Sequence, residues 1–155
     1  MAREPLPTWT FALIVVRLGP RFLLVHERKH GGGWYLPAGC IEAGETIVDG
    51  AVRETLEEAG IPVVLDGILR IEHSPQSSGH VRMRVIFHAH PADDTPPKAE
   101  PDGESQGAGW FLPAQLRELP LRGSEVLRIV EDVERGAPVH PLSLLAPEGT
   151  PLLPR

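Results

Sequence analysis

Short apolar runs separated by glycine and proline turns dominate the first half of the chain. Residues 10–16 are rich in β-branched side chains, and residues 22–26 follow the turn formed by Gly19-Pro20. Both runs are therefore predicted to be strands. Residues 63–71 are mostly apolar and are also predicted to be extended, and a last short strand is predicted at 109–112.

Residues 81–90 alternate between two kinds of side chain. A period of two is typical of a strand that buries one face and exposes the other. The segment is therefore predicted to be a half-buried strand. One predicted face holds Val81, Met83, Val85 and Phe87, and the other holds Arg82, Arg84, Ile86 and His88.

The clearest predicted helix covers residues 46–59. Thr46, followed three residues later by Asp49, is typical of a capped helix start. Gly60 stands where a glycine commonly ends a helix, and Pro62 prevents its continuation. The start and the end of this helix are thus both predicted from local chemistry.

Two further helices are predicted at 113–119 and 124–134. The sequence contains no internal repeat. Strands interspersed with helices predict one α/β domain in which helices pack on a small sheet. We place this domain at residues 1–136. Prolines crowd into the remaining segment, so residues 137–155 are predicted to be a proline-rich tail.

Composition narrows the classes of function. The chain has 155 residues and a formal net charge of −6, with no basic stripe of the kind that a nucleic-acid groove needs. It has no apolar run long enough to span a bilayer, and residues 1–8 do not resemble a secretory signal. Cys40 is the single cysteine, so we expect no internal disulfide and a cytoplasmic location.

Three glutamates of the predicted helix 46–59 share one side. Glu54, Glu57 and Glu58 are spaced at i, i+3 and i+4, so their carboxylates lie close together and repel one another. A bound cation would relieve this repulsion, and Mg²⁺ favours such oxygen ligands beside phosphates. A solvated acidic face is the alternative interpretation of the three glutamates alone.

A longer segment around these glutamates resembles the signature of the Nudix family, G-x5-E-x7-R-E-U-x-E-E-x-G-U, in which U is a bulky aliphatic residue. Residues 39–61 read GCIEAGETIVDGAVRETLEEAGI. Thr55 is the one departure, because an aliphatic residue is usual there, and we expect it to face the core. The matching positions are Gly39, Glu45, Arg53, Glu54, Glu57, Glu58, Gly60 and Ile61.

The resemblance implies a Nudix αβα sandwich, with a mixed β-sheet flanked by helices. It implies an enzyme that uses Mg²⁺, or Mn²⁺ in its place, to hydrolyse a phosphoanhydride bond. Arg53 would pair with Glu45 and hold the glycine-containing loop against the helix. The metal ligands would be Glu54, Glu57, Glu58 and the backbone carbonyl of Gly39.

The resemblance leaves the proton acceptor undecided. Glu57 or Glu58 could take the proton of the attacking water, as could Glu104, a glutamate of a later loop whose alternative role is that of a solvated side chain. Gly60 is expected to be structural. Gly50, one turn before the acidic side, either leaves room for substrate or allows tight packing.

Candidate substrate contacts lie outside the signature. Arg28 follows the second strand and Arg84 lies on the polar face of a later one, beside Arg82; each could reach a phosphate or remain solvated. Trp34 and Tyr35 precede the signature. They could stack on a base, although anchoring the loop is the more common role of such aromatics.

The C-terminal third resembles Nudix enzymes that convert 8-oxo-guanine nucleoside diphosphates to monophosphates. It reads PLRGSEVLRIVEDVERG and then VHPLSLL. We therefore expect a nucleotide as the small-molecule partner, and leave a homodimer as an option. One alternative is hydrolysis of ADP-ribose or another molecule linked through a nucleoside diphosphate, with Pro75 as its only hint. Another is a non-catalytic, nucleotide-sensing Nudix domain.

Overall fold

The computed structural model describes residues 2–154. Seven strands among them form one mixed sheet, in which β1 and β6 run parallel and the other paired strands run antiparallel. The order is β3-β2-β1-β6-β5, with β4 paired to β1 and β7 paired to β2. The strands are β1 (Thr8–Leu18), β2 (Arg21–Glu27), β3 (Trp34–Tyr35), β4 (Ala38–Cys40), β5 (Val63–Pro75), β6 (Val81–Pro91) and β7 (Ser105–Phe111).

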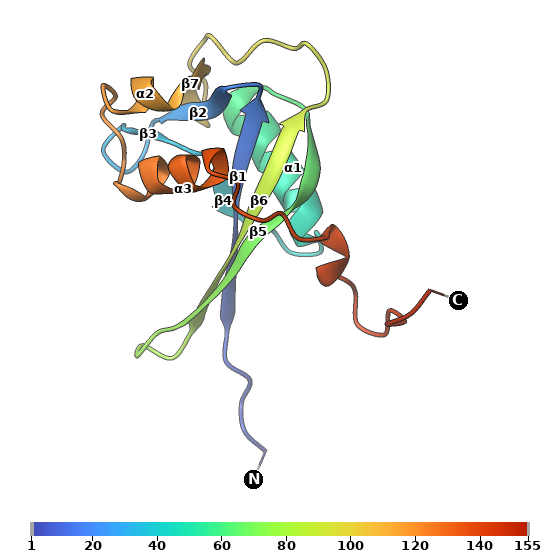
Figure 1. Ribbon diagram of the computed structural model, residues 1–155. Helices are drawn as coiled ribbons and strands as arrows, with labels where there is room; N and C mark the ends of the chain where they lie inside the picture. Colours follow the sequence, from blue (N-terminus) through green and yellow to red (C-terminus); the bar gives the residue numbers. More distant parts are fainter. Residues whose placement is uncertain (1, 155) are drawn as a thin grey trace.

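Helices cover both faces of the sheet. Figure 1 shows α1 on one side of β1 and β6, with α2 and α3 on the other side. This arrangement confirms the expected αβα sandwich. The helices are α1 (Ile47–Ala59), α2 (Pro113–Leu116), α3 (Glu125–Glu134) and the short 3-10 helix η1 (Leu142–Leu144).

Helix α1 begins and ends where its local chemistry predicted. The hydroxyl of Thr46 accepts a hydrogen bond from the backbone N–H of Asp49 at 3.1 Å, and Gly60 ends the helix at a φ of 71°. Thr55 is fully buried, and its hydroxyl donates to the carbonyl of Ala51 at 2.9 Å. The one departure from the signature therefore faces the core, as expected.

Each layer of helix encloses its own apolar core. One core lies between the sheet and α1, and the other lies between the sheet, α2 and α3. The prediction that β6 is half-buried was wrong at Ile86, which is only 4% exposed on the face predicted to be polar. Helix α3 covers that face of β6. The central part of the strand is therefore buried on both faces, although its sequence pattern predicted burial of one face only.

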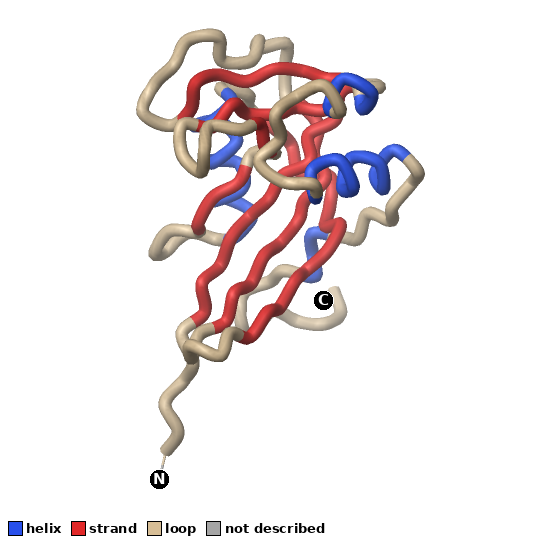
Figure 2. Tube along the Cα trace, turned by 90° about the vertical axis from the view of Figure 1, so that its left-hand side faces the viewer, coloured by secondary structure: helices blue, strands red, loops and turns tan. Residues whose placement is uncertain are grey.

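Several predicted boundaries also differ from the structure. Strand β7 begins at Ser105 rather than at residue 109, α2 ends at Leu116 rather than at 119, and β4 lies within a segment predicted to be a loop. Strands β5 and β6 extend together to Pro75 and Val81, and Figure 2 shows them reaching with β1 beyond the helices. Partner strands satisfy their backbone hydrogen bonds there, which local hydrophobicity could not indicate.

The first part of the proline-rich tail packs on the domain. His140 and Ile68 exchange two backbone hydrogen bonds of 2.7 Å each, and Leu142 and Leu145 pack against the core beside α1. Gly67 permits this approach, because a β-carbon there would lie 2.4 Å from the carbonyl oxygen of His140. Within residues 2–154, no helix is both long and apolar enough to cross a membrane.

Candidate active site

A cavity of about 470 Å³ lies between the sheet and α1. Its walls come from β1, β2, β3, β4, β6 and α1, from the loop that follows β2, and from the loops that precede β7 and α3. The cavity has an acidic part and a basic part. The acidic side chains are Glu27, Glu54, Glu58 and Glu104; the basic ones are Arg28, Lys29, Arg82, Arg84 and Arg122.

Helix α1 and strand β4 build the acidic part together. Glu54 and Glu58 lie one turn apart on α1, and both line the cavity with Gly39 of β4. The carboxylate of Glu54 occupies the space beside Gly39, since a β-carbon there would lie 2.0 Å from the Glu54 carboxyl carbon. The N–H of Ala38 donates to Glu58 Oε2 at 3.4 Å. Gly39, Glu54 and Glu58, three of the four predicted metal ligands, therefore lie together in the structure.

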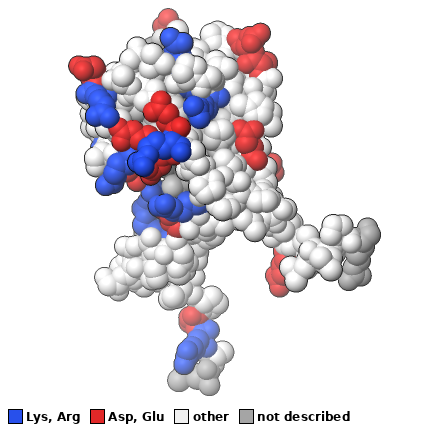
Figure 3. All heavy atoms as spheres, viewed as in Figure 1, with Lys and Arg blue, Asp and Glu red and all other residues white. Residues whose placement is uncertain are grey.

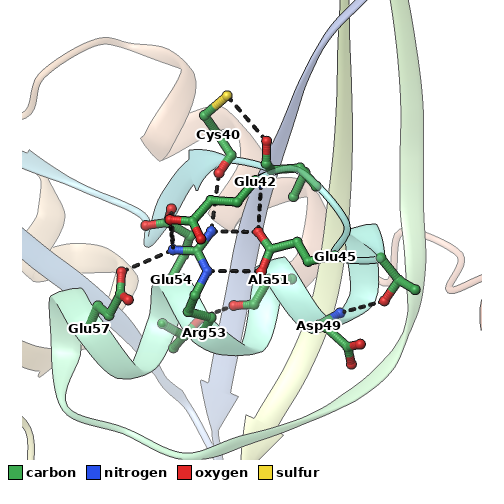
Figure 4. Close-up of polar contacts among 11 residues, drawn as sticks. Cys40, Glu42, Glu45, Asp49, Ala51, Arg53, Glu54 and Glu57 are labelled. Atoms are coloured by element: carbon green, nitrogen blue, oxygen red, sulfur yellow. Dashed lines mark hydrogen bonds and ion pairs between the residues drawn. The ribbon is translucent and has the colours of Figure 1, made fainter.

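Arg53 joins the loop to the helix, as Figure 4 shows. Its Nε and Nη2 donate to the two carboxylate oxygens of Glu45 at 3.0 and 2.6 Å, and its Nη2 also donates to the carbonyl of Cys40 at 3.2 Å. The expected pairing of Arg53 with Glu45 is therefore present. Arg53 Nη1 also donates to Glu54 and Glu57, at 2.9 and 3.0 Å.

Glu57 is placed differently from its two neighbours. Its side chain is 42% exposed and pairs with Arg53, and it does not line the cavity. The structure therefore brings two of the three predicted metal ligands into the cavity and holds the third at its edge. Among residues 2–154, no three His, Cys, Asp or Glu side chains are arranged to hold a metal ion as they stand.

The chemistry of the acidic part nevertheless suits a cation. Burial raises the pKa of Glu58 to about 8, against the opposing effect of the Ala38 N–H, and the charges of Glu54, Glu27 and Glu104 raise it further. Burial also raises the pKa of Glu54, although Arg53 opposes this. Crowded carboxylates in a desolvated place are stabilised by a divalent ion. Glu54, Glu58 and the Gly39 carbonyl fit that role, and Glu57 would join them by leaving Arg53.

The loop before β7 is fastened to the end of α1. Lys98 donates its backbone N–H to the Ala59 carbonyl at 2.8 Å, its ammonium donates to the carbonyl of Glu57, and it forms an ion pair with Asp102 at 2.6 Å. The same loop carries Glu104, an exposed residue, to the cavity wall. Glu104 therefore lies where it can reach a bound substrate.

The predicted substrate arginines both line the cavity, but both have partners. Arg28 Nη1 donates to the backbone carbonyl of Asp102 at 2.6 Å. Arg84 is held between Glu72, at 2.5 Å from its Nε, and Glu125, whose two oxygens accept from it at 2.8 and 2.9 Å. Arg84 is thus positioned by two carboxylates, and its charge is largely balanced before any substrate binds.

The aromatic residues before the signature contact the protein. Trp34 stacks on His26 with ring centroids 4.7 Å apart, and the buried Tyr35 donates its hydroxyl to Glu125. These contacts agree with anchoring rather than with stacking on a base. Gly50 also serves packing, because a β-carbon there would lie 2.6 Å from Ile41 Cδ1.

Arg122 and Glu27 also line the cavity, and neither was predicted from the sequence. Arg122, from the loop before α3, lies over the ring of Tyr35 at 4.5 Å and donates to Glu27 Oε1 at 3.0 Å. Glu27 ends β2 and has a side chain that is only 12% exposed. A glutamate at the end of a mostly apolar strand was the available indication for Glu27. Nothing local pointed to Arg122.

Comparison with known proteins agrees with this geometry. The family model described as the NUDIX domain matches residues 7–131. The human 8-oxo-dGDP phosphatase NUDT18 is 38% identical over 112 residues, which are 70% of this chain and 33% of that protein. The NAD-capped RNA hydrolase NudC of Pectobacterium atrosepticum is 31% identical over 121 residues, 77% of this chain and 45% of that protein. The chain thus spans less than half the length of these relatives.

Solved structures have the same fold. A NUDIX hydrolase from Nitrosomonas europaea has a TM-score of 0.75 and 27% identity, covering 91% of this chain and 97% of its own. An ADP-ribose pyrophosphatase from Streptococcus suis has a TM-score of 0.65, covering 86% of this chain and 96% of its own. Its 21% identity supports the fold alone. With the family model matched across 7–131, and with Gly39, Glu54 and Glu58 of the signature lining one cavity, the chain belongs to the NUDIX family.

Proposed function

We propose that the protein hydrolyses the phosphoanhydride bond of nucleoside diphosphates, with Mg²⁺ as its cofactor and Mn²⁺ as a substitute. Oxidised guanine nucleotides are the favoured substrates, so that 8-oxo-dGDP or 8-oxo-GDP and one water give the nucleoside monophosphate and orthophosphate. The observation that carries the proposal is that carboxylates, among them Glu54 and Glu58, and arginines, among them Arg28 and Arg84, line the same cavity. A diphosphate that binds with a divalent cation needs both kinds of side chain.

The carboxylates of the cavity would hold the cation. Glu54, Glu58 and the carbonyl of Gly39 are its ligands, with Glu57 added once it leaves Arg53. When bound, Mg²⁺ neutralises the diphosphate, orients it and lowers the pKa of a water molecule. Burial raises the pKa of both Glu54 and Glu58, so a cation beside them would stabilise two desolvated carboxylates.

The chain's own residues would orient the substrate and accept the proton. Arg28 and Arg84 lie on the cavity wall, where their guanidinium groups can donate to phosphate oxygens. Glu104 is on the loop that Lys98 fastens to α1, so its carboxylate stays beside the cavity and can take the proton of the attacking water. Arg53 acts by position, since it holds the loop of Glu45 against the helix.

The preference for oxidised guanine rests on sequence similarity. The human and mouse relatives named 8-oxo-dGDP phosphatase are each 38% identical to this chain over 112 residues. Oxidation adds an N7–H donor and a C8 oxygen to guanine. An acceptor that faces N7 would therefore discriminate strongly, because the wrong base leaves buried polar groups unpaired.

The test compares kcat/KM for 8-oxo-dGDP, dGDP, 8-oxo-dGTP and ADP-ribose at one Mg²⁺ concentration, with identified products. We expect 8-oxo-dGDP to be the best substrate and its products to be 8-oxo-dGMP and orthophosphate. We expect no turnover in excess EDTA. A Glu131→Gln variant, changed on the outside of α3, serves as the control for charge and handling. Nucleotide binding without turnover in the presence of Mg²⁺ would instead support a sensor.

The second candidate is hydrolysis of molecules linked through a nucleoside diphosphate. The 31% identity to a NAD-capped RNA hydrolase favours including it. NADH and ADP-ribose therefore belong in the same assay. A clear lead for either one would replace the 8-oxo-guanine proposal and would leave the cation site and the hydrolysis of a phosphoanhydride unchanged.

A further inference from the structure

Glu27 holds an unusual position among the carboxylates of this protein. Its Oε1 accepts a hydrogen bond from Arg122 at 3.0 Å, but its Oε2 is buried and has no hydrogen-bond partner. Among the side chains of residues 2–154 that are not exposed, it is the one buried oxygen or nitrogen left without a partner. A buried carboxylate oxygen without a partner is costly, so its presence calls for a ligand.

Two carboxylates that anchor arginines use both of their oxygens, whereas Glu72 and Glu131 use one and leave no buried oxygen without a partner. Glu45 accepts from Arg53 through Oε1 and Oε2, at 2.6 and 3.0 Å. Glu125 accepts from Arg84 through both oxygens as well, at 2.8 and 2.9 Å. A residue that only anchored Arg122 would be expected to resemble these carboxylates. Glu27 instead keeps one oxygen free and buried.

The backbone holds Glu27 in place from both sides. Its N–H donates to the carbonyl of Gly33 at 3.0 Å, and its carbonyl accepts from the side chain of Gln106 at 2.7 Å. The pairing of β2 with β7 is irregular at this point, because His26 pairs with Gly107 whereas Glu27 pairs with Ser105. Such bulges redirect side chains and are common beside active sites.

Glu27 lines the same cavity as the proposed cation ligands. Glu27, Glu54 and Glu58 all line it, and the charge of Glu27 acts on Glu58. The bulge also connects the two groups, since the hydroxyl of Ser105 donates to the backbone carbonyl of Glu58 at 2.6 Å. The strand end that carries Glu27 is therefore fixed against the helix that carries Glu54 and Glu58.

We propose that Glu27 is a further carboxylate of the divalent-cation site and contributes its Oε2, directly or through a water, beside Glu54 and Glu58. Arg122 then occupies the other oxygen, and the backbone contacts of Glu27 hold the residue in place. This inference rests on the proposed function for the presence of the cation, but not for the identity of the nucleotide.

The experiment measures the Kd for Mn²⁺ without nucleotide, by electron paramagnetic resonance of the free ion. Glu27→Gln keeps the shape of the side chain and an oxygen for Arg122, but removes the acceptor at the free position. We expect the Kd to rise by about tenfold or more, the size of effect typical for residues that support a metal site. Glu131→Gln is the matched control, because Glu131 also pairs with a single arginine, Arg117, and lies outside the cavity. Its Kd should equal that of the wild type.

Arg122→Ala separates the two roles of Glu27. Under the proposal this variant binds Mn²⁺ as tightly as the wild type or more tightly, because a positive charge leaves the cavity while Glu27 remains. If Glu27 were only an anchor for Arg122, Glu27→Gln would leave the Kd within twofold of the wild type, and that result overturns the proposal. Equal weakening in Glu27→Gln and Arg122→Ala overturns it too.

Two further results of the experiment also distinguish the role of Glu27 from the alternatives. Should Glu27→Gln fail to fold, Glu27→Asp takes its place: its shortened carboxylate weakens Mn²⁺ binding under the proposal and leaves the Kd unchanged if Glu27 is only an anchor. A weaker Kd in a protein that hydrolyses none of the tested nucleotides supports the role of Glu27 and refutes the proposed substrates. If turnover is lost in Glu58→Gln but the Kd for Mn²⁺ is unchanged in Glu27→Gln, the result supports the proposed function and refutes the role of Glu27.

Discussion

The carboxylate of Glu54 lies in the space that Gly39 leaves by having no side chain. A β-carbon at residue 39 would lie 2.0 Å from the Glu54 carboxyl carbon and 2.2 and 2.3 Å from its two oxygens. The φ of Gly39 is not positive, so its backbone could be adopted by other residues. The requirement for glycine at residue 39 is therefore one of space for the carboxylate of Glu54.

The first prediction follows from this contact. Gly39→Ala should force the flexible Glu54 side chain away and lower kcat/KM about a hundredfold, the cost of displacing a catalytic group by about 1 Å. The melting temperature should change little, because the displaced atoms are the end of a side chain. Steady-state kinetics and thermal unfolding of the same samples check both parts. A stable variant with full activity would contradict the placement of Glu54 in the site.

The second prediction concerns Arg53, which positions the loop through Glu45. Arg53→Ala should lower kcat/KM by about 10 to 100 fold, the typical cost of losing a residue that supports a metal ligand. Arg53→Lys restores the charge but not the pair of parallel hydrogen bonds, so it should recover only part of the activity. Hydrogen exchange of residues 39–45 should increase in both variants, and most in Arg53→Ala. If Arg53→Ala keeps full activity and unchanged hydrogen exchange at residues 39–45, Arg53 does not position the loop.

The third prediction concerns Glu58. Glu58→Gln should lower kcat on the order of 10² to 10⁴ fold at saturating Mg²⁺, whether the residue binds the cation or accepts a proton. Without metal the variant should be at least as stable as the wild type, because the substitution removes one of several crowded negative charges. Urea unfolding in EDTA tests the second part. Near-normal turnover in Glu58→Gln would refute its place in the chemistry.

The fourth prediction uses the ion pair of Glu125 with Arg84. The hydrogen bonds from Arg84 lower the pKa of Glu125 to about 2, against the effect of burial. A lowered pKa stabilises the folded state at pH values above the unfolded pKa near 4.5, and this stability is lost as the pH falls toward 2. Glu125→Gln should therefore cost about 1 to 3 kcal/mol at pH 7 and much less at pH 2.5. Urea unfolding at both pH values gives the comparison.

Glu131→Gln is the control for that measurement. Glu131 pairs with Arg117 near α2, and both side chains are at least 35% exposed. Figure 3 shows acidic and basic side chains mixed over this part of the surface. Exposed pairs of this kind contribute little, so the variant should match the wild type at both pH values. An equal loss in the two variants would assign the effect of Glu125 to general surface charge.

The local sequence predicted those parts of the protein that depend on nearby residues. The caps of α1, the buried Thr55 and the pairing of Arg53 with Glu45 all lie within 39–61, where spacing determines which side chains meet. Arg53 and Glu45 are 8 residues apart: Glu45 lies in the loop just before α1, and Arg53 lies about two turns into the helix. The caps and the buried Thr55 follow from capping chemistry and periodicity, whereas the pairing of Arg53 with Glu45 was implied by the resemblance to the Nudix signature.

Contacts between distant segments could not be predicted in the same way. Glu27 and Arg122 are 95 residues apart, and Arg84 and Glu125 are 41 apart. Their meeting depends on how β2, β6 and the loop before α3 are arranged around the sheet. The burial of Ile86 has the same origin, because it depends on α3 lying over β6. The sequence displays each of these residues only as an ordinary charged or apolar position.

The exchange of hydrogen bonds between His140 and Ile68 has a consequence for association. Strand β5 is at the end of the sheet order, and an unpaired strand edge is a template for pairing with another chain. The segment at His140 occupies part of that edge, and Leu142 and Leu145 cover apolar surface beside it. A fragment trimmed at the predicted boundary, residue 136, would uncover both. It should therefore self-associate and aggregate more readily than the chain that keeps this segment.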